Sequence, residues 1–126
     1  MPLRVGLDLV AVDTVEVTLR GDHAAHYLER VYTQREVDDC RDASGVIDPM
    51  RLAARFAAKE AMIKALPGAG EGVRLTTIEV VSDSSGGVRP ELSGHAAELA
   101  EAAGITELAL SLTHDSGFAA AAVVTQ

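Results

Sequence analysis

Aromatic residues are almost absent from this sequence: two Tyr, two Phe and no Trp make up 3% of its 126 residues. A core must therefore be built mainly from Ala, Val, Leu and Ile, which make many small contacts and few large ones. A chain of this length is typical of one domain, and we expect a single domain over residues 1–126. Burial of further apolar surface between subunits would stabilise such a core, so the composition is compatible with an oligomer.

Cysteine and long apolar segments are equally scarce. Cys40 is the only cysteine, which excludes an intramolecular disulfide and is typical of a reducing compartment. No known motif surrounds it, which disfavours a catalytic thiol. Asp8 interrupts the apolar stretch MPLRVGLDLVAVD, so we expect neither a signal peptide nor a membrane-spanning segment. These features predict a cytoplasmic protein without a membrane partner.

Positive charge is in short supply overall, because the formal net charge is -8 at pH 7. Nucleic-acid binding needs positive charge facing the phosphates, so we expect no nucleic-acid partner. The charge is unevenly spread: residues 20–74 contain nine basic and nine acidic residues, whereas the remainder contains two and ten. Any anion-binding surface is therefore expected from the central part of the chain.

The hydrophobic and turn patterns predict strands at both ends of the chain with helices between them. Strands are expected at residues 3–12 (buried), at 75–82, and in the closing segments ELALSLTH and FAAAAVV, joined by an Asp-Ser-Gly turn. Helices are expected within 14–29, where the β-branched TVEVTL weakens the pattern, from a Thr33–Glu36 capping box to about Arg41, from Asp48–Pro49 to Leu66, and over 95–103. This order is typical of an α+β fold.

The first candidate site is Asp8, which lies within the apolar strand predicted at residues 3–12. Burying an unpaired carboxylate is expensive. Asp8 therefore either binds a metal or accepts hydrogen bonds as a structural residue, and in isolation the second alternative is favoured.

The second candidate site is the segment RLAARFAAKEAMIKAL at residues 51–66. It carries one carboxylate, Glu60, among four cations: Arg51, Arg55, Lys59 and Lys64. Glu60 and Lys64 are four residues apart, which in isolation favours an exposed pair contributing about 0.3–0.5 kcal/mol. The alternative is a functional role in which Glu60 binds Mg²⁺ and Lys64 offsets phosphate charge. We expect Arg51 at the surface.

The third candidate site is the loop that follows this helix, with glycines at Gly68, Gly70 and Gly72. Glycines let backbone N–H groups approach a phosphate or a flat base closely. A flexible connection explains the loop equally well, and its spacing matches no phosphate-binding fingerprint.

A weaker candidate lies near the C-terminus. Ser111 and Thr113 are expected on one face of a strand, and His114 at its end. His114 is either a phosphate contact or an ordinary turn residue. A Ser-x-x-His hydrolase is disfavoured, because no nucleophile elbow precedes the serine.

Taken together and in this order, these segments resemble the short phosphopantetheinyl transferases, the holo-acyl-carrier-protein synthases. The resemblance covers nearly the whole chain. It is carried by Gly6-Leu7-Asp8, by Arg55-Phe56-Ala57-Ala58-Lys59-Glu60-Ala61 with Lys64, by the glycine loop, and by Ser111-Leu112-Thr113-His114. It implies the phosphopantetheinyl transferase fold, a small antiparallel sheet packed with helices, and a homotrimer with active sites at the subunit interfaces.

The same resemblance implies transfer of 4′-phosphopantetheine from coenzyme A to a serine of an acyl carrier protein, with release of adenosine 3′,5′-bisphosphate. By position, Asp8 and Glu60 would hold Mg²⁺ together with the pyrophosphate of coenzyme A, and Lys64 would neutralise that pyrophosphate. The remaining coenzyme contacts implied are Arg55 and His114 at the 3′-phosphate, the loop of Gly68, Gly70 and Gly72 at the adenosine, and Lys59, Ser111 and Thr113 without an assigned role.

One departure from the family concerns the surface that meets the carrier. The short synthases usually present an arginine about six residues after Gly-x-Asp, at the start of a helix that docks the acidic carrier; here residues 12–16 read VDTVE. Arg20, Arg30, Arg35 and Arg41 could provide the surface instead. We therefore expect a carrier other than the usual fatty-acid protein, such as a polyketide-type carrier.

Two other functions stay open at this point. The chain could be a non-catalytic carrier-binding module in which Asp8 and Glu60 hold a structural cation. It could also be a small Mg²⁺-dependent hydrolase of coenzyme A or nucleotides, with water in place of the carrier serine.

Overall fold

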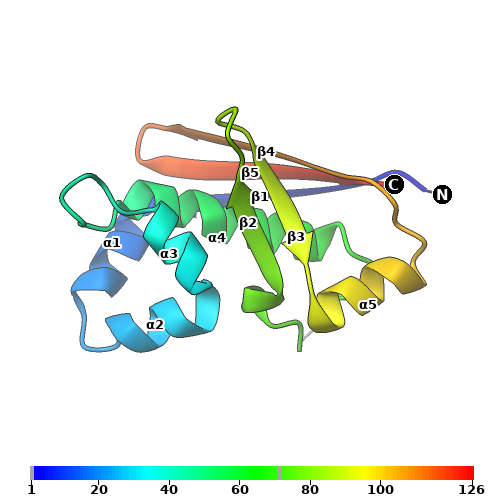
Figure 1. The fold of residues 1–126 in the computed structure, drawn as a ribbon, viewed down its shortest axis with the longest axis horizontal. Helices are drawn as coiled ribbons and strands as arrows, with labels where there is room; N and C mark the ends of the chain where they lie inside the picture. Colours follow the sequence, from blue (N-terminus) through cyan, green and yellow to red (C-terminus); the bar gives the residue numbers. More distant parts are fainter. Residues whose placement is uncertain (1, 71) are drawn as a thin grey trace.

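A computed structural model describes residues 2–70 and 72–126, and within these residues the chain forms five α-helices and two antiparallel sheets (Figure 1). The elements are β1 (Arg4–Ala11), α1 (Val12–Arg20), α2 (Ala24–Val31), α3 (Gln34–Asp39), α4 (Pro49–Lys64), the 3₁₀ turn η1 (Leu75–Thr77), β2 (Ile78–Ser82), β3 (Val88–Leu92), α5 (Gly94–Ala102), β4 (Leu108–Asp115) and β5 (Phe118–Thr125). One sheet has the order β1-β5-β4, and β2 pairs with β3 in the other. The α+β prediction is confirmed.

Most of the predicted elements are present, with three differences. The strand expected at 75–82 begins at Ile78, and residues 75–77 form the 3₁₀ turn η1 instead. The segment at 14–29 is two helices, α1 and α2, separated at Gly21. The β-branched residues of α1 are helical because Val15 is buried in the core, and packing outweighs a weak local preference. Strand β3, which the sequence did not predict, completes a hairpin with β2.

Helix α4 is the central element of the fold. Its start is set as predicted, with the Asp48 side chain accepting a hydrogen bond from the Met50 N–H at 2.9 Å and Pro49 in the first turn. The helix contacts β1, β5, β4 and β2, while α1–α3 gather at one of its ends and α5 lies at the other (Figure 1). Buried alanines line much of it, including Ala53, Ala57 and Ala61. Small side chains therefore allow the sheet to approach the helix closely.

The three-stranded sheet has one buried face and one exposed face. Val10, Ala119, Ala121 and Val123 point toward α4 and are buried. The opposite face carries five large apolar side chains that are 45–64% exposed in this chain: Leu3, Val5, Leu7, Leu9 and Phe118. The prediction that residues 3–12 form a buried strand is therefore wrong for this face, because an apolar run without polar alternation does not show which face the chain itself covers. Among the described residues, no helix is long and apolar enough to cross a bilayer.

Gly6 is where β1 lies closest to α4. A Cβ atom at this position would collide with the carbonyl oxygen of Ala61 and lie 2.8 Å from its carbonyl carbon. Both atoms belong to the backbone of a helix that is packed on several sides, so neither can move without shifting the whole helix.

We predict that Gly6→Ala destabilises the fold by about 3 kcal/mol or more, because the added methyl overpacks a backbone contact. Denaturant unfolding followed by circular dichroism measures this change. The control is Gly21→Ala, where the added Cβ would lie 3.5 Å from the Thr18 carbonyl oxygen, an ordinary van der Waals contact. Equal stability of the two variants would contradict the close packing of β1 on α4.

Candidate functional site

The β1–α4 junction brings together three of the predicted site residues. Asp8 points toward α4 from the inner face of β1, and the Lys64 ammonium lies 3.1 Å from its Oδ1 atom. Lys64 also donates a hydrogen bond to the Leu7 carbonyl at 2.8 Å. The exposed Glu60–Lys64 pair favoured by the helix in isolation is not among the ion pairs of the described residues. Lys64 instead joins the helix to the strand.

Glu60 lies one turn before Lys64 on α4 and completes this cluster. Burial raises the pKa of its carboxyl group, the charge of Asp8 raises it further, and Lys64 partly opposes the shift. Two neighbouring carboxylates therefore share a half-buried site with one ammonium group. Such a pair is the oxygen donor set that Mg²⁺ takes when substrate phosphates and water supply its other ligands. No group of three or more metal-binding side chains occurs among the described residues, so the protein alone would supply only part of a coordination shell.

Arg55 lies in a second cluster. Its side chain is 6% exposed, its Nη2 atom donates to Ser82 Oγ at 3.1 Å, and its Nε atom has no hydrogen-bond partner among the described residues. Arg55 lines a hollow of about 160 Å³ together with Thr113 and His114. A buried guanidinium without a carboxylate partner is costly, so this hollow favours an anion.

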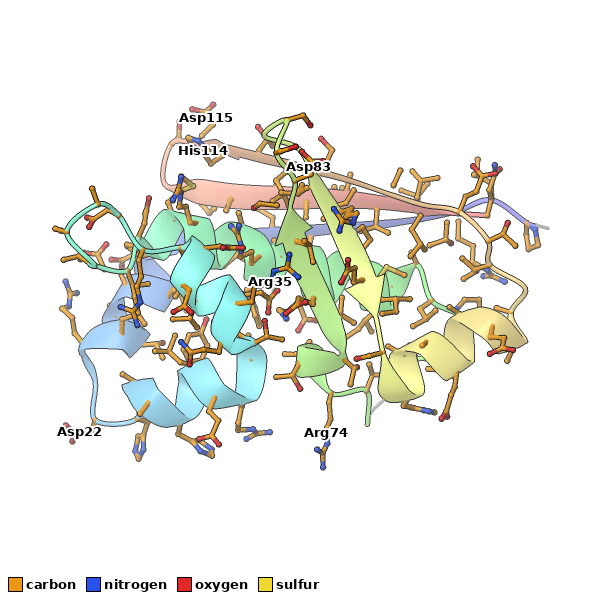
Figure 2. All side chains as sticks on the ribbon, viewed as in Figure 1. Asp22, Arg35, Arg74, Asp83, His114 and Asp115 are labelled. Carbon is orange, nitrogen blue, oxygen red and sulfur yellow. The ribbon has the colours of Figure 1, made fainter. Side chains whose placement is uncertain are left out.

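His114 occupies the outer end of this second cluster. It lies near the β4–β5 turn beside Asp115, where Figure 2 shows both side chains. Thr113 precedes it and also lines the hollow. Ser111 pairs across the strands with Ala122 and is exposed on the outer face of the sheet. The structure therefore joins Thr113 and His114 to Arg55 but leaves Ser111 apart from them.

The glycine loop lies near a third feature, a larger hollow of about 920 Å³ between α2 and residues 72–76. Gly72 is on its wall. Gly68 instead lies in ordinary contact with Leu99 of α5, and Gly70 has open space around it. The three glycines therefore do not share one surface on this chain.

Four side chains on the wall of the large hollow are basic or can become so: His23, His26, Arg30 and Arg74. Arg74 projects outward beside η1 (Figure 2). Of the four arginines considered for the carrier surface, three form ion pairs: Arg20 with Glu16, Arg35 with Glu79 and Arg41 with Asp38. Arg30 forms none with the described residues, so it is the member of the four best placed to meet an acidic partner.

The predicted coenzyme contact of Lys59 does not fit its position in the structure. It is fully buried, and its Nζ atom lies 2.6 Å from Glu36 Oε1. The same atom donates to the carbonyl oxygens of Leu75 at 2.9 Å and Ile78 at 2.7 Å. An ammonium with these three partners and no exposed surface has no capacity for a coenzyme contact, so the prediction that Lys59 binds the coenzyme is contradicted. Lys59 instead holds α4 against α3 and β2.

Glu36 has a second structural role that the sequence did not predict. The capping box with Thr33 was predicted and is confirmed. The same carboxylate also accepts a hydrogen bond from the Val80 N–H at 2.8 Å and pairs with Lys59. Both partners are far from Glu36 in the sequence, so no local pattern could have identified them.

Known proteins resemble this chain over nearly its whole length. The family model described as 4′-phosphopantetheinyl transferase superfamily matches residues 4–123. The holo-[acyl-carrier-protein] synthase of Myxococcus xanthus is 43% identical over 97% of this chain and 93% of its own length. That of Anaeromyxobacter sp. (strain K) is 42% identical over 98% of this chain and 95% of its own length.

Solved structures agree with this. The Chronobacterium ammoniagenes ACPS-CoA complex has a TM-score of 0.84 and 34% identity, and the match covers 100% of this chain and 98% of that one. The Helicobacter pylori holo-[acyl-carrier-protein] synthase in complex with coenzyme A has a TM-score of 0.81 and 29% identity over 97% and 99% of the two chains. This chain belongs to the 4′-phosphopantetheinyl transferase superfamily and, within it, to the holo-[acyl-carrier-protein] synthases.

Proposed function

We propose that this chain transfers the 4′-phosphopantetheine group of coenzyme A to a serine of an apo acyl carrier protein in a Mg²⁺-dependent reaction. The observation that carries the proposal is the meeting of Asp8, Glu60 and Lys64 at the β1–α4 junction. The relatives named as holo-[acyl-carrier-protein] synthases and the similar structures that contain coenzyme A support it.

The residues present fit a Mg²⁺ ion. Asp8 and Glu60 supply hard oxygen donors. The pKa of Glu60 is raised first by burial and then by the charge of Asp8, and a bound cation would offset both effects. When bound, Mg²⁺ would supply positive charge to the oxygens of the pyrophosphate. The partial coordination shell leaves positions for those oxygens.

Lys64 supplies the second positive charge. Its side chain is 54% exposed, so its ammonium can reach a ligand while remaining close to Asp8. In the proposed reaction the carrier serine oxygen forms a bond to the phosphorus next to pantetheine. The bond from that phosphorus to the bridging oxygen breaks, adenosine 3′,5′-bisphosphate leaves, and the serine proton passes to solvent. Lys64 stabilises the negative charge that develops on the phosphate oxygens.

The Asp8–Glu60–Lys64 cluster and the Arg55–His114 cluster lie far apart on one chain, which favours an active site shared between two copies of the chain. Lys64 and Arg55 are nine residues apart on α4, which places them about 13.5 Å apart along the helix and half a turn out of phase. Their strand partners, Asp8 on β1 and His114 on β4, lie on the two edges of the sheet, with β5 between them. We propose a homotrimer in which the β1 edge of one copy adjoins the β4 edge of the next, so that one coenzyme contacts both clusters.

The exposed face of the three-stranded sheet supports this assembly. Complete burial of an exposed large apolar side chain contributes about 1.5–3 kcal/mol, and these five side chains, which are 45–64% exposed, would each gain part of that. Contiguous apolar surface of this kind marks an interaction site. A head-to-tail contact between identical copies closes into a ring when the rotation allows it, as three copies would.

The carrier is proposed to differ from the usual fatty-acid protein. Helix α1 presents Asp13 and Glu16 where a cation is expected, and Arg20 is paired with Glu16 at 3.3 Å. An acidic carrier would therefore be repelled at α1 and attracted by Arg30 and Arg74 beside α2. A polyketide-type carrier is the proposed physiological partner.

The central test is mass spectrometry of an apo carrier protein incubated with coenzyme A. With Mg²⁺ we expect a gain of about 340 Da, the mass of the group moved by this Mg²⁺-assisted transfer. Asp8→Ala or Glu60→Ala should lower the rate at least ~100-fold, because each removes a group that stabilises transition-state charge. Glu98→Ala, which removes an exposed carboxylate of α5, is the matched control and should keep the wild-type rate.

Other outcomes of this assay identify the alternatives. Cleavage of coenzyme A without an adduct on any carrier would indicate a hydrolase. Carrier binding without consumption of coenzyme A would indicate a binding module. Full transfer by Glu60→Ala would refute the metal assignment. Repeating the assay over a panel of purified carriers tests the choice of partner, and modification of a fatty-acid carrier as fast as every other carrier would refute the dedicated partner.

The trimer predicts a specific sensitivity to charge on the exposed sheet face. The wild-type chain should have a solution mass of about three times its 13.2 kDa by light scattering. Val5→Glu should reduce this mass and the transfer rate together, because it buries a charge in the proposed interface. Val46→Glu is the control, since Val46 is 62% exposed in a loop and Val5 is 64% exposed on the sheet. A monomeric wild type, or a trimeric Val5→Glu variant, would contradict the assembly.

The pH dependence of Glu60 provides a further prediction. Because its folded-state pKa is raised, Glu60 keeps its proton to a higher pH in the folded chain than in the unfolded chain. Its favourable contribution to stability is therefore complete below the unfolded pKa and is lost as the pH rises through the folded pKa. Asp8→Asn should lower the pKa of Glu60 by removing a like charge, and Mg²⁺ should lower it in the wild type.

A carboxyl ¹³C NMR titration measures this pKa directly. The control variant is Asp13→Asn, which removes a carboxylate on α1 and should leave the Glu60 titration unchanged. A Glu60 pKa that responds to neither Asp8→Asn nor Mg²⁺ would show that the two carboxylates do not share a site.

A further inference from the structure

A second arginine lies beside Arg55 in the smaller hollow. Arg51 is one turn earlier on α4 and lines the same hollow of about 160 Å³ with Arg55 and His114. Its Nη1 atom donates only to the backbone carbonyl of Asp39 at 3.3 Å. Neither arginine forms an ion pair with a carboxylate among the described residues. Two arginines therefore line one small space without compensating negative charge from these residues.

The rest of the lining also favours an anion. The other lining residues are Met50, Ala54, Leu112 and Thr113, and no carboxylate is among them. A volume of about 160 Å³ suits a group of phosphate size rather than a nucleoside.

Arg55 is the independent sign of a ligand. It is 6% exposed and its Nε atom is buried without a hydrogen-bond partner among the described residues. Ser82 fixes the other side of the guanidinium by accepting a hydrogen bond from Nη2 at 3.1 Å. Arg51 is exposed and its one hydrogen bond is long, so it is free to turn toward an anion that Arg55 already holds. Together they can form charge-assisted, bidentate hydrogen bonds to one phosphate.

We propose that Arg51 is a specificity-determining residue of this site, and that with Arg55 it selects donors carrying a phosphate monoester. The inference rests on the proposed function. A phosphate monoester carries a charge of about -1.5 to -2 at pH 7, whereas each phosphate of a pyrophosphate diester carries only one charge. In coenzyme A the monoester is the 3′-phosphate. Arg51 thus discriminates coenzyme A from 3′-dephospho-coenzyme A.

The position of Arg51 separates this role from the chemical step. It lines the hollow beside Arg55 and does not belong to the cluster of Asp8, Glu60 and Lys64 that is proposed to act on the pyrophosphate. Loss of its charge should therefore weaken use of the phosphorylated donor without affecting a donor that lacks the monoester.

The test compares kcat/KM for coenzyme A and for 3′-dephospho-coenzyme A. We expect Arg51→Gln to lower kcat/KM for coenzyme A about tenfold or more and to leave the value for the dephosphorylated donor within about twofold. Arg89→Gln is the matched control, because Arg89 is an exposed arginine on β3, paired with Glu91 outside both clusters, and should change neither value. Equal losses for both donors, or no loss for either, would overturn the proposal.

A binding measurement keeps the inference separate from the proposed function. Calorimetry with adenosine 3′,5′-bisphosphate and adenosine 5′-monophosphate needs no transfer reaction. We expect the wild type to prefer the bisphosphate and Arg51→Gln to lose about tenfold or more of that preference. An unchanged preference would overturn the role of Arg51 even if transfer occurs. A lost preference in a chain that transfers nothing would refute the proposed reaction while supporting the phosphate site.

Discussion

The close contact between Gly6 of β1 and Ala61 of α4 determines where the site residues lie. No side chain larger than hydrogen fits at Gly6 without displacing the helix backbone. Asp8 follows two residues later on the same strand face, and Lys64 follows Ala61 by three residues, nearly one helical turn. The contact therefore brings the carboxylate and the ammonium to 3.1 Å. The Gly-x-Asp motif is explained by packing at its first residue and by chemistry at its third.

The buried Glu36–Lys59 pair fixes the helix from its other side. It joins α4 to α3 and, through the carbonyl of Ile78 and the N–H of Val80, to β2. Removing one partner of such a pair leaves an uncompensated buried charge, which costs about 3–5 kcal/mol. Lys59 and Glu60 are adjacent in the sequence but have different tasks, because consecutive helical residues point about 100° apart.

The sequence was informative wherever a structure depends on neighbouring residues. The capping box at Thr33, the helix start at Asp48 and the β4–β5 turn all follow from local hydrogen-bonding rules. Long-range features were not predictable in this way: Lys59 meets a partner 23 positions away, and the hollow beside Arg55 needs β4 to lie against α4. The apolar run of β1 predicted a strand, but its exposed face is visible only once the chain's own covering elements are known.

The central claim is that Asp8 and Glu60 form a divalent-cation site next to the pyrophosphate of the bound coenzyme. Crystals grown with coenzyme A and Mn²⁺ test it most directly, because Mn²⁺ accepts the same oxygen ligands as Mg²⁺ and scatters anomalously. We expect an anomalous-difference peak within about 2.5 Å of carboxylate oxygens of both Asp8 and Glu60, in contact with the pyrophosphate. A peak held by other residues, or coenzyme bound with no peak between these two carboxylates, would contradict it.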